Sequence, residues 1–395
     1  MKNIHLIGIG GAGLSAIAKV LIESGYQVSG SDRAYSDPAR ELQKEGAKVY
    51  TGHRAEQIQD ADIVVRSSAI PDDNVEVLAA MNSGIPVLKR GEFLEELASS
   101  KKVIAVAGTH GKTTCTSMIA WMLSELGLDP SFIIGGKSLN LGTNAHAGKG
   151  EYFIIEADEY DRMFWGLKPE IAVVTNVEHD HVDFYPTPED FFQAFVGFIE
   201  RVKPGGILIT CDNDPGAALL RTRAAGMDIK TYSYGDTGTH YDCYSRDEAL
   251  NTVGGYAFSV SCSSLNETHS ANSAEINLRI PGRFNIRNAL AAMAVAHVLD
   301  LPLLEAARAL NSFQGTGRRF ELVGEKNGIT LIDDYAHHPT EIRSTLRAAR
   351  ERYAARPIWV VWQPHTYSRT RALIEDYVSA FEDADHLVIT EIYAA

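Results

Sequence analysis

The chain has 395 residues, of which 45% are hydrophobic and 22% charged, and its formal net charge is −14. This composition is typical of a folded globular protein, and the length predicts two or three domains. The acidic balance argues against non-specific binding to nucleic acid or to membrane surfaces, because both need basic stripes on the protein.

The N-terminal stretch, residues 2–32, predicts a strand, a glycine-rich turn, a helix and a second strand that ends in Asp32. It begins with a glycine-broken strand instead of a signal peptide, and no apolar run is long enough to span a bilayer, so we expect a cytoplasmic protein. The glycines that could bring the backbone against a diphosphate are Gly8, Gly10, Gly11 and Gly13. Such a motif indicates a diphosphate more reliably than it indicates NAD.

Alternating strand and helix patterns continue after Asp32. ADIVVRSSAI predicts a strand that Pro71 ends, a helical stretch runs to Ser83, and a short strand follows at residues 85–88. We therefore predict a small Rossmann-like α/β domain over residues 1–97.

The stretch AVAGTHGKTT, residues 105–114, predicts a phosphate-binding loop. A buried strand over residues 103–107 breaks at a glycine and leads through GTHGKTT into a helical pattern. Glycines let backbone N–H groups approach phosphate oxygens, Lys112 supplies a positive charge, and the hydroxyl of Thr113 can hold a magnesium ion. The loop is shorter than the usual nucleotide-binding consensus. An ordinary glycine turn is the alternative, but it leaves the joint occurrence of strand, lysine and helix unexplained.

Polar side chains follow two later strands of this region. Glu156 and Asp158 follow one strand, and Asn176, Asp180 and His181 follow the next. Ligands bind at the carboxyl ends of strands in an open parallel sheet, so we expect both clusters to converge on the phosphate-binding loop. Each residue alone could be a solvated loop residue. Two clusters in register with the loop favour a functional site.

The later part of this region, residues 231–282, predicts antiparallel strands, with loop-like composition at residues 251–252 and 265–273. The four cysteines show no CxxC spacing, and they are Cys115, Cys211, Cys243 and Cys262. We therefore expect neither a disulfide framework nor a zinc site, and we expect reduced thiols.

A helix is predicted from Phe284 to Leu299, with Asn285 and Asn288 on one face of its first turn. These amides could bond an adenine edge or cap the helix. NSFQGTGRRFE, with two glycines and paired arginines, indicates a linker. We therefore predict a central domain over residues 98–312 and a third domain over residues 313–395.

The third domain predicts three strands, separated by helical stretches over residues 340–353 and 371–383. The polar strings DDYAHHP and QPHTYSRT stand at strand ends. Three strands would leave an apolar face uncovered, and the chain stops after the last of them, so we expect the protein to continue past Ala395.

Eight ordered motifs together resemble the Mur ligases of peptidoglycan synthesis: GIGGAGLS, GTHGKTT, EADEYD, TNVEHDH, GRFNIRNAL, GTGRRFE, DDYAHHPTEI and QPHTYSRTR. The resemblance covers nearly the whole chain. It implies an ATP-dependent ligase of three α/β domains: a Rossmann-like domain for a UDP-sugar, a central P-loop-type domain for Mg-ATP with an antiparallel flank, and a Rossmann-like C-terminal domain, truncated here, for the amino acid. Family members that add later residues typically carry a carbamoylated lysine after the DH motif. Here no lysine lies between His181 and Lys203.

The last two motifs are typical of the family members that act on UDP-N-acetylmuramate. The resemblance implies that ATP phosphorylates the lactyl carboxylate of this substrate and that the amino group of L-alanine then attacks the acyl phosphate. A murein peptide ligase, which adds a tripeptide to the same acceptor, is the first alternative. An NAD-dependent oxidoreductase built on the first glycine loop is another, but it leaves GTHGKTT and GRRFE unexplained. A protein that binds ATP without ligation is a third.

The resemblance also implies roles for individual residues. The catalytic residues would be Lys112, Glu156, His181, Arg319 and His337, with Thr113, Glu156 and His181 binding magnesium. ATP would contact Gly108, Thr109, His110, Gly111, Lys112, Thr113, Thr114, Asn285, Asn288, Arg319 and Asp334. The UDP-sugar would contact Gly8, Gly10, Gly11, Gly13, Ser15, Asp32 and Ser68, and the amino acid would contact Tyr335, His337 and Arg369. His337 would orient or deprotonate the amine, although it could instead belong to a turn before Pro339 with no catalytic part.

Overall fold

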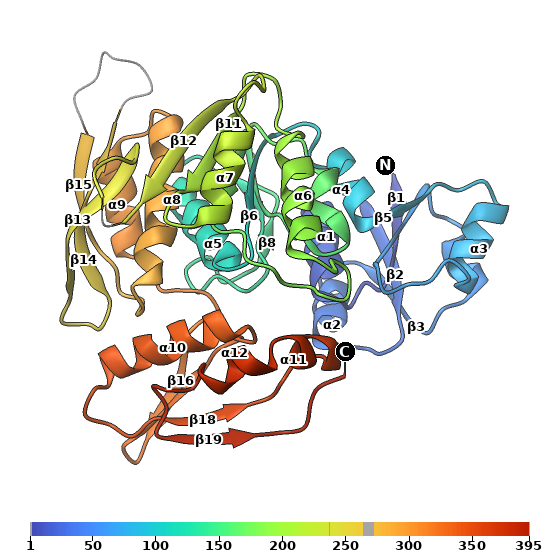
Figure 1. The fold of residues 1–395 in the computed structure, drawn as a ribbon. Coiled ribbons are helices and arrows are strands. Elements are labelled where there is room, and N and C mark those ends of the chain that lie inside the picture. The colour runs from blue at the N-terminus through green and yellow to red at the C-terminus, as the bar shows by residue number, and fades with distance from the viewer. Residues whose placement is uncertain (1, 237, 264–271, 395) are drawn as a thin grey trace.

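The structure is a computed structural model that describes residues 2–236, 238–263 and 272–394. Most of the loop predicted at residues 265–273 lies outside the described residues. Figure 1 shows three regions along the chain: a small N-terminal α/β region, a large central region, and a C-terminal region that packs below the central one. No helix in the described part of the chain is long and apolar enough to cross a membrane.

The N-terminal region is a five-stranded parallel sheet in the order β3-β2-β1-β4-β5. Its strands are β1 (Asn3–Ile7), β2 (Gln27–Asp32), β3 (Lys48–Thr51), β4 (Ile63–Arg66) and β5 (Val87–Lys89). Its helices are α1 (Ala12–Glu23), α2 (Asp37–Lys44), α3 (Val75–Asn82) and α4 (Arg90–Ala98), with a 3₁₀ turn over Ala55–Ile58. The strand order reverses at β1, so the glycine loop after β1 lies at the switch point where such sheets bind ligands.

The central region is built on a ten-stranded sheet in the order β15-β14-β13-β12-β11-β10-β6-β9-β7-β8. Its strands are β6 (Lys102–Ala107), β7 (Ser131–Ile133), β8 (Ala145–His146), β9 (Tyr152–Glu156), β10 (Ile171–Val174), β11 (Ile207–Cys211), β12 (Lys230–Gly235), β13 (Cys243–Leu250), β14 (Tyr256–Cys262) and β15 (Asn272–Asn277). Strand β6 pairs in parallel with β10 on one side and with β9 on the other. The carboxyl ends of these three strands therefore meet at one edge of the sheet, as predicted.

Helices cover both faces of this sheet (Figure 1), and they are α5 (Lys112–Glu125), α6 (Pro188–Ile199), α7 (Pro215–Arg223), α8 (Phe284–Val298) and α9 (Leu303–Asn311), with a 3₁₀ segment over Tyr160–Gly166. Strand β6 shows the two faces. Ile104 and Val106 pack into the core that contains α5 and α8, whereas Ala105 and Ala107 pack into the core that contains α6. The strand is an unbroken apolar run because both of its faces are buried.

The expected antiparallel part begins later than predicted. Strand β12 runs parallel to β11 and, over two residues, parallel to β13, and antiparallel pairing starts between β13 and β14. Composition cannot give the direction of β13, because the direction depends on where β13 starts beside β12. Cys243, the first residue of β13, is the register partner of Tyr234 near the end of β12. Residues 251–252, which have a loop-like composition, lie in the connection between β13 and β14.

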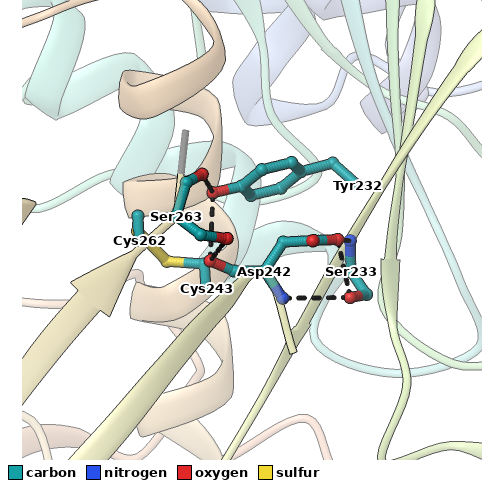
Figure 2. Close-up of a disulfide and its surroundings, with 6 residues drawn as sticks. All are labelled: Tyr232, Ser233, Asp242, Cys243, Cys262 and Ser263. Carbon is teal, nitrogen blue, oxygen red and sulfur yellow. Dashed lines mark hydrogen bonds between the residues drawn. A yellow bond between two sulfur atoms is a disulfide. The ribbon is translucent and has the colours of Figure 1, made fainter. Parts of the chain in front are cut away.

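The expectation that all cysteines are reduced is wrong for one pair. Cys243 and Cys262 form a disulfide (Figure 2). They are register partners in β13 and β14, with Cα atoms 4.1 Å apart, and both are fully buried. Their spacing in sequence hides this pairing, because it depends on the register of the hairpin. Cys115 and Cys211 are free and buried.

The C-terminal region contains two separate two-stranded sheets. Its elements are β16 (Glu321–Lys326), β17 (Ile329–Asp333), α10 (Pro339–Arg352), β18 (Trp359–Trp362), α11 (Tyr367–Ala372), α12 (Ile374–Val378) and β19 (His386–Ile389). The three predicted strands are present, but β17 pairs with β16 and not with β18. The helix predicted over residues 371–383 is instead two short helices that meet at Leu373. An uncovered apolar face is present, since Trp359 and Val361 in β18 are 66% and 74% exposed.

Candidate active site

The predicted phosphate-binding loop lies between β6 and α5, and close contacts require its two glycines. Gly108 has φ +138°, and a Cβ atom there would lie 2.0 Å from Oγ1 of Thr175. Gly111 has φ +80°, and its Cβ atom would lie 2.7 Å from Oδ1 of Asn288. A side chain at either position would therefore strain the backbone and push away a neighbour. Asn288 belongs to α8, which brings the predicted adenine residues against the loop.

The end of β10 braces the loop from the other side. The backbone N–H of His110 donates to Oδ1 of Asn176 at 2.8 Å, and Nδ2 of Asn176 donates back to the carbonyl of His110 at 3.0 Å. The hydroxyl of Thr109 donates to the carbonyl of Glu178 at 2.7 Å. The loop is also bonded from within, because Nζ of Lys112 donates to the carbonyls of Gly108 and Thr109.

Lys112 is paired with an acid that the sequence analysis did not select. Its Nζ is 2.8 Å from Oε2 of Glu159, whose side chain is 2% exposed. Nε2 of His181 is 3.4 Å from the other carboxylate oxygen. Burial alone would raise the pKa of Glu159, but the charge of Lys112 and the hydrogen bond to His181 hold it below its usual value. Glu159 therefore joins two of the predicted catalytic residues.

Glu156 and Thr113 lie side by side, next to this pair. The hydroxyl of Thr113 donates to Oε1 of Glu156 at 3.0 Å, and the N–H of Gly135 donates to Oε2 at 2.6 Å. Burial raises the pKa of Glu156. A hydroxyl and a partly buried carboxylate without an ion pair among the described residues fit Mg²⁺, which prefers hard oxygen ligands. His181 contacts Glu159 and contributes a nitrogen.

A cavity of about 260 Å³ lies between the central and C-terminal regions. It is lined by predicted ATP-binding residues, including His110, Gly111, Thr113, Asn285, Arg319 and Asp334. Nδ2 of Asn288 donates to Oδ1 of Asn285 at 2.9 Å, and Nδ2 of Asn285 donates to the carbonyl of Pro281 at 2.7 Å. The structure thus brings the loop, the two amides and the C-terminal residues to one cavity.

Asp334 and Arg319 enter this cavity from the C-terminal region. Asp334 accepts hydrogen bonds from the N–H groups of Phe320 and Ala336, each at 2.7 Å, and burial raises its pKa. The guanidinium of Arg319 lies 5.6 Å from the ring centre of Tyr335. Asp334 therefore fixes the start of β16 to the turn after β17, and this contact aims Arg319 at the pocket.

The residues predicted to hold the amino acid also lie together. The rings of Tyr335 and His337 are 5.2 Å apart, and His365, which the sequence analysis did not select, is 6.2 Å from His337. Burial lowers the pKa of His337 to about 4. Nδ1 of His337 donates to the carbonyl of Tyr335 at 3.0 Å, so Nε2 is the acceptor of the neutral ring.

Arg369 is already engaged by an acid. Its Nε and Nη2 donate to the two carboxylate oxygens of Asp180 at 2.9 and 3.2 Å, and both side chains are buried. Its Nη1 faces His365 at 3.4 Å. Arg369 comes from α11 and Asp180 from the turn after β10, so this ion pair joins the C-terminal and central regions.

The glycine loop of the N-terminal region has the predicted form. Gly8 has φ +91°, and the N–H of Gly10 donates to Oδ2 of Asp32 at 2.9 Å. A Cβ atom on Gly13 would lie 1.8 Å from Nη1 of Arg90, which pairs with Asp158 of the central region at 3.1 Å. Arg90 therefore adds a positive charge to this loop that motif reading missed.

Two other predicted UDP-sugar residues lie at the same edge of this sheet. Ser15 is in the first turn of α1, where its hydroxyl donates to the carbonyl of Ala12 at 3.1 Å. Ser68 follows β4 in the next loop. The structure therefore gathers the predicted UDP-sugar residues around the carboxyl ends of β1, β2 and β4.

Among the described residues, the group spaced to hold a metal ion is His110, Glu178 and His338, whose ligand atoms lie within 4.8 Å of one another. Glu156 and His181 do not form such a group. The three predicted magnesium ligands are joined by separate contacts, Thr113 to Glu156 and His181 to Glu159, and of the three only Thr113 lines the cavity.

These features define a class of protein: a P-loop-type nucleotide-binding enzyme in which a third region faces the phosphate loop across the pocket. The family follows from three matches along the chain. The Mur ligase catalytic domain matches residues 3–102, the Mur ligase middle domain residues 106–296, and the Mur ligase glutamate ligase domain residues 318–394. The chain belongs to the Mur ligase family.

Full-length relatives agree with this assignment. UDP-N-acetylmuramate–L-alanine ligase of Geobacter sp. strain M21 is 45% identical over 395 residues, which are 100% of this chain and 83% of the relative. The solved UDP-N-acetylmuramate-alanine ligase from Thermotoga maritima is 28% identical with a TM-score of 0.83, covering 100% of this chain and 86% of that one. A murein peptide ligase from Psychrobacter arcticus is 29% identical with a TM-score of 0.79, covering 98% and 84%.

Proposed function

We propose that this protein is an ATP-dependent ligase that joins L-alanine to the lactyl carboxylate of UDP-N-acetylmuramate in peptidoglycan precursor synthesis. The observation that carries the proposal is the 45% identity to a ligase of that name over the whole chain. The pocket supports it, because the GTHGKTT loop of the central region and Asp334 and Arg319 of the C-terminal region line one cavity. ATP and a nucleotide-linked sugar are cytoplasmic substrates, so we place the protein in the cytoplasm.

The three substrates would occupy three places. The diphosphate of the UDP-sugar would lie on the glycine loop after β1, with Asp32 and Arg90 beside it. The triphosphate of ATP would lie on GTHGKTT, with adenine toward Asn285 and Asn288. Alanine would lie near Tyr335 and the rings close to it.

In the first step a carboxylate oxygen attacks the γ-phosphorus, the bond to the β–γ bridging oxygen breaks, and ADP leaves. Lys112 and Arg319 would neutralise the charge of the phosphoryl group during transfer. Thr113 and Glu156, with His181 nearby, would hold magnesium, which when bound offsets the repulsion between the two anions. Glu159 would keep Lys112 and His181 aimed at this place before ATP binds.

In the second step the neutral amine of alanine attacks the acyl carbon, inorganic phosphate leaves with the bonding electron pair, and the proton lost by the nitrogen passes to the departing phosphate. The low pKa of His337, about 4, makes it a weak base, so we propose that it orients the amine through Nε2 instead of deprotonating it. Nη1 of Arg369 would contact the α-carboxylate, since Asp180 engages the rest of the guanidinium. Orientation of two bound reactants can supply about 7 to 11 kcal/mol.

The main competitor is a murein peptide ligase, which the match to the Psychrobacter arcticus enzyme keeps in view. The two functions differ in the third substrate. Purified protein is incubated with Mg-ATP, UDP-N-acetylmuramate and either alanine or the tripeptide, and ADP is measured. We expect ADP only when ATP, the UDP-sugar and alanine are all present. ADP formation with the tripeptide alone would reverse the assignment, and NADH binding without ATP binding would favour an oxidoreductase.

A further inference from the structure

His110 lies between two carboxylates that come from different regions of the molecule. Its Nε2 is 3.0 Å from Oε2 of Glu178, and its Nδ1 is 3.2 Å from Oε1 of Glu341. Glu178 follows β10 in the central region, whereas Glu341 belongs to the first turn of α10. A neutral imidazole carries a single N–H, so both hydrogen bonds form only when the ring carries two protons and a positive charge.

The charged state agrees with the surroundings of His110. Burial alone would lower its pKa, but the hydrogen bonds to Glu178 and Glu341 raise it to about 9. The ring of His338 packs 4.8 Å from the ring of His110, and burial and the charge of His110 lower the pKa of His338. At neutral pH we therefore expect one imidazolium, two carboxylates and one neutral imidazole in this cluster.

Glu341 has a second set of contacts inside the C-terminal region. Its Oε2 accepts hydrogen bonds from the N–H groups of His337 at 3.1 Å and His338 at 3.3 Å. Its Oε1 is 3.8 Å from Nη1 of Arg319, and the side chain is 12% exposed. One carboxylate therefore contacts the predicted phosphate loop, the arginine proposed to face the γ-phosphate, and the backbone of the proposed amino-acid site.

A further contact holds α10 in this place. The hydroxyl of Thr340 donates to Oε1 of Glu178 at 2.7 Å. The start of α10 is thus bonded twice to the end of β10, once directly and once through His110. Breaking the charge of either His110 or Glu341 leaves the other ion buried with fewer partners, which is costly.

We propose that Glu341, acting through His110, is a positioning residue that fixes Arg319 and His337 relative to the phosphate loop. The proposal rests on the ligase function proposed above. It makes the geometry of the alanine site depend on the docking of α10 against the nucleotide loop. The UDP-sugar site lies in another region and does not depend on this contact.

The test compares Glu341→Gln, His110→Gln and the double variant, with Glu375→Gln as the control, because Glu375 is an exposed acid of the same region. We expect each single variant to lower kcat and raise KM for alanine by about tenfold to 10²-fold, since small misplacements have effects of this size. KM for UDP-N-acetylmuramate should stay within twofold. The loss of kcat and the rise in KM in the double variant should be about as large as in either single variant, because both substitutions break the same interaction.

Three results would overturn the proposal: an unchanged KM for alanine in both single variants, additive losses in the double variant, or equal increases of all three KM values with a lower melting temperature. Wild-type protein that forms no ADP with any substrate would instead contradict the proposed function. In that event the same four proteins still test the contact through their melting temperatures, in which the two single effects should not add. Additive shifts of melting temperature would overturn it there.

Discussion

Lys112, which we propose binds phosphate, is paired with Glu159. Glu159 is almost fully buried, and the negative charge beside it keeps the pKa of Lys112 above its usual value in spite of burial. An incoming triphosphate would therefore compete with a carboxylate for an already charged amine. We expect Lys112 to change partners on binding and not to change protonation state.

Replacement of Lys112 tests this residue directly. We expect Lys112→Ala to lower the rate of ADP formation by about 10²-fold to 10³-fold, the usual effect of losing one preorganised charge or donor at a transition state. Lys112→Arg keeps the charge but not the fit, so it should recover only part of the rate. ADP release with all three substrates measures both. A Lys112→Ala rate within tenfold of wild type would remove Lys112 from the proposed mechanism.

The sequence identifies single residues when a local motif carries them. GTHGKTT places Thr113 at the start of α5, and the strand before Glu156 places that acid at the neighbouring strand end, and the two side chains are in contact. Glu159 and Glu341 have no such signal. Their importance depends on a 3₁₀ turn after β9 and on the docking of α10, which are tertiary features. The assigned roles stay predictions.

The contact between helix α10 and the end of β10 through His110 should make stability depend on pH. The groups that face His110 are Glu178 from the end of β10 and Glu341 and His338 from α10. The pKa of His110 is raised from about 6.5 to about 9, so this contact adds stability below about pH 6.5 and loses it as the pH rises through about 9. At low pH the carboxylates decide the stability of this contact. The pKa of Glu178 is lowered to about 2, so its contribution is lost as the pH falls toward that value.

Thermal unfolding of wild type and His110→Gln over a pH series checks this sign. We expect wild type to be more stable between pH 6 and 8, and the difference in melting temperature to shrink above pH 9, where His110 loses its charge. His240→Gln serves as the control for a histidine outside the contact. A difference that grows with pH, or one that is constant from pH 6 to 10, would contradict the assignment of a charged His110.

The hairpin of β13 and β14 carries a prediction about the disulfide. Cys243 and Cys262 are 19 residues apart in sequence, and a cross-link over a loop of this size typically stabilises a fold by about 2 to 4 kcal/mol. We expect Cys243→Ser with Cys262→Ser to lower the free energy of unfolding by this amount and to leave KM for ATP unchanged. Intact mass before and after reduction shows whether the bond is present. Two free thiols in the oxidised protein would contradict it.

The prediction of helices and strands succeeds where the spacing of hydrophobic residues alone distinguishes a helix from a strand. Strand β6, helix α5 and helix α8 match the predicted stretches because their faces are buried by neighbours on both sides. It fails for the direction of β12 against β13 and for the stretch after residue 371, where a helix breaks at Leu373. Both features depend on tertiary packing of the neighbouring elements, which the amino-acid composition of the segment does not determine.

At the scale of the whole molecule, ion pairs connect the three regions. Arg90 pairs with Asp158 at 3.1 Å between the N-terminal and central regions, and Arg369 pairs with Asp180 between the central and C-terminal regions. Ligands that bridge regions should therefore stabilise the entire chain.

The domain boundaries near residues 97 and 312 stay predictions. The chain spans 83% and 84% of the length of two curated relatives.

ATP binding gives the matching prediction for the full chain. A ligand at about 100 times its Kd stabilises the folded state by about 2.7 kcal/mol. We expect Mg-ATP to raise the melting temperature of wild type and of Glu375→Gln, and to raise that of Lys112→Ala much less. Differential scanning fluorimetry over a range of ATP concentrations measures this. Equal shifts in all three proteins would place ATP outside the phosphate-binding loop.

The missing side chain at Gly135 has a consequence for redesigning substrate preference. A Cβ atom there would lie 2.5 Å from Oε2 of Glu156, so a single methyl group is enough to displace this acid. Asn285 and Asn288 line the cavity and end in amides that bond to each other and to a backbone carbonyl. Attempts to change the nucleotide preference should therefore begin at these amides, because Gly135→Ala would move the carboxylate of Glu156.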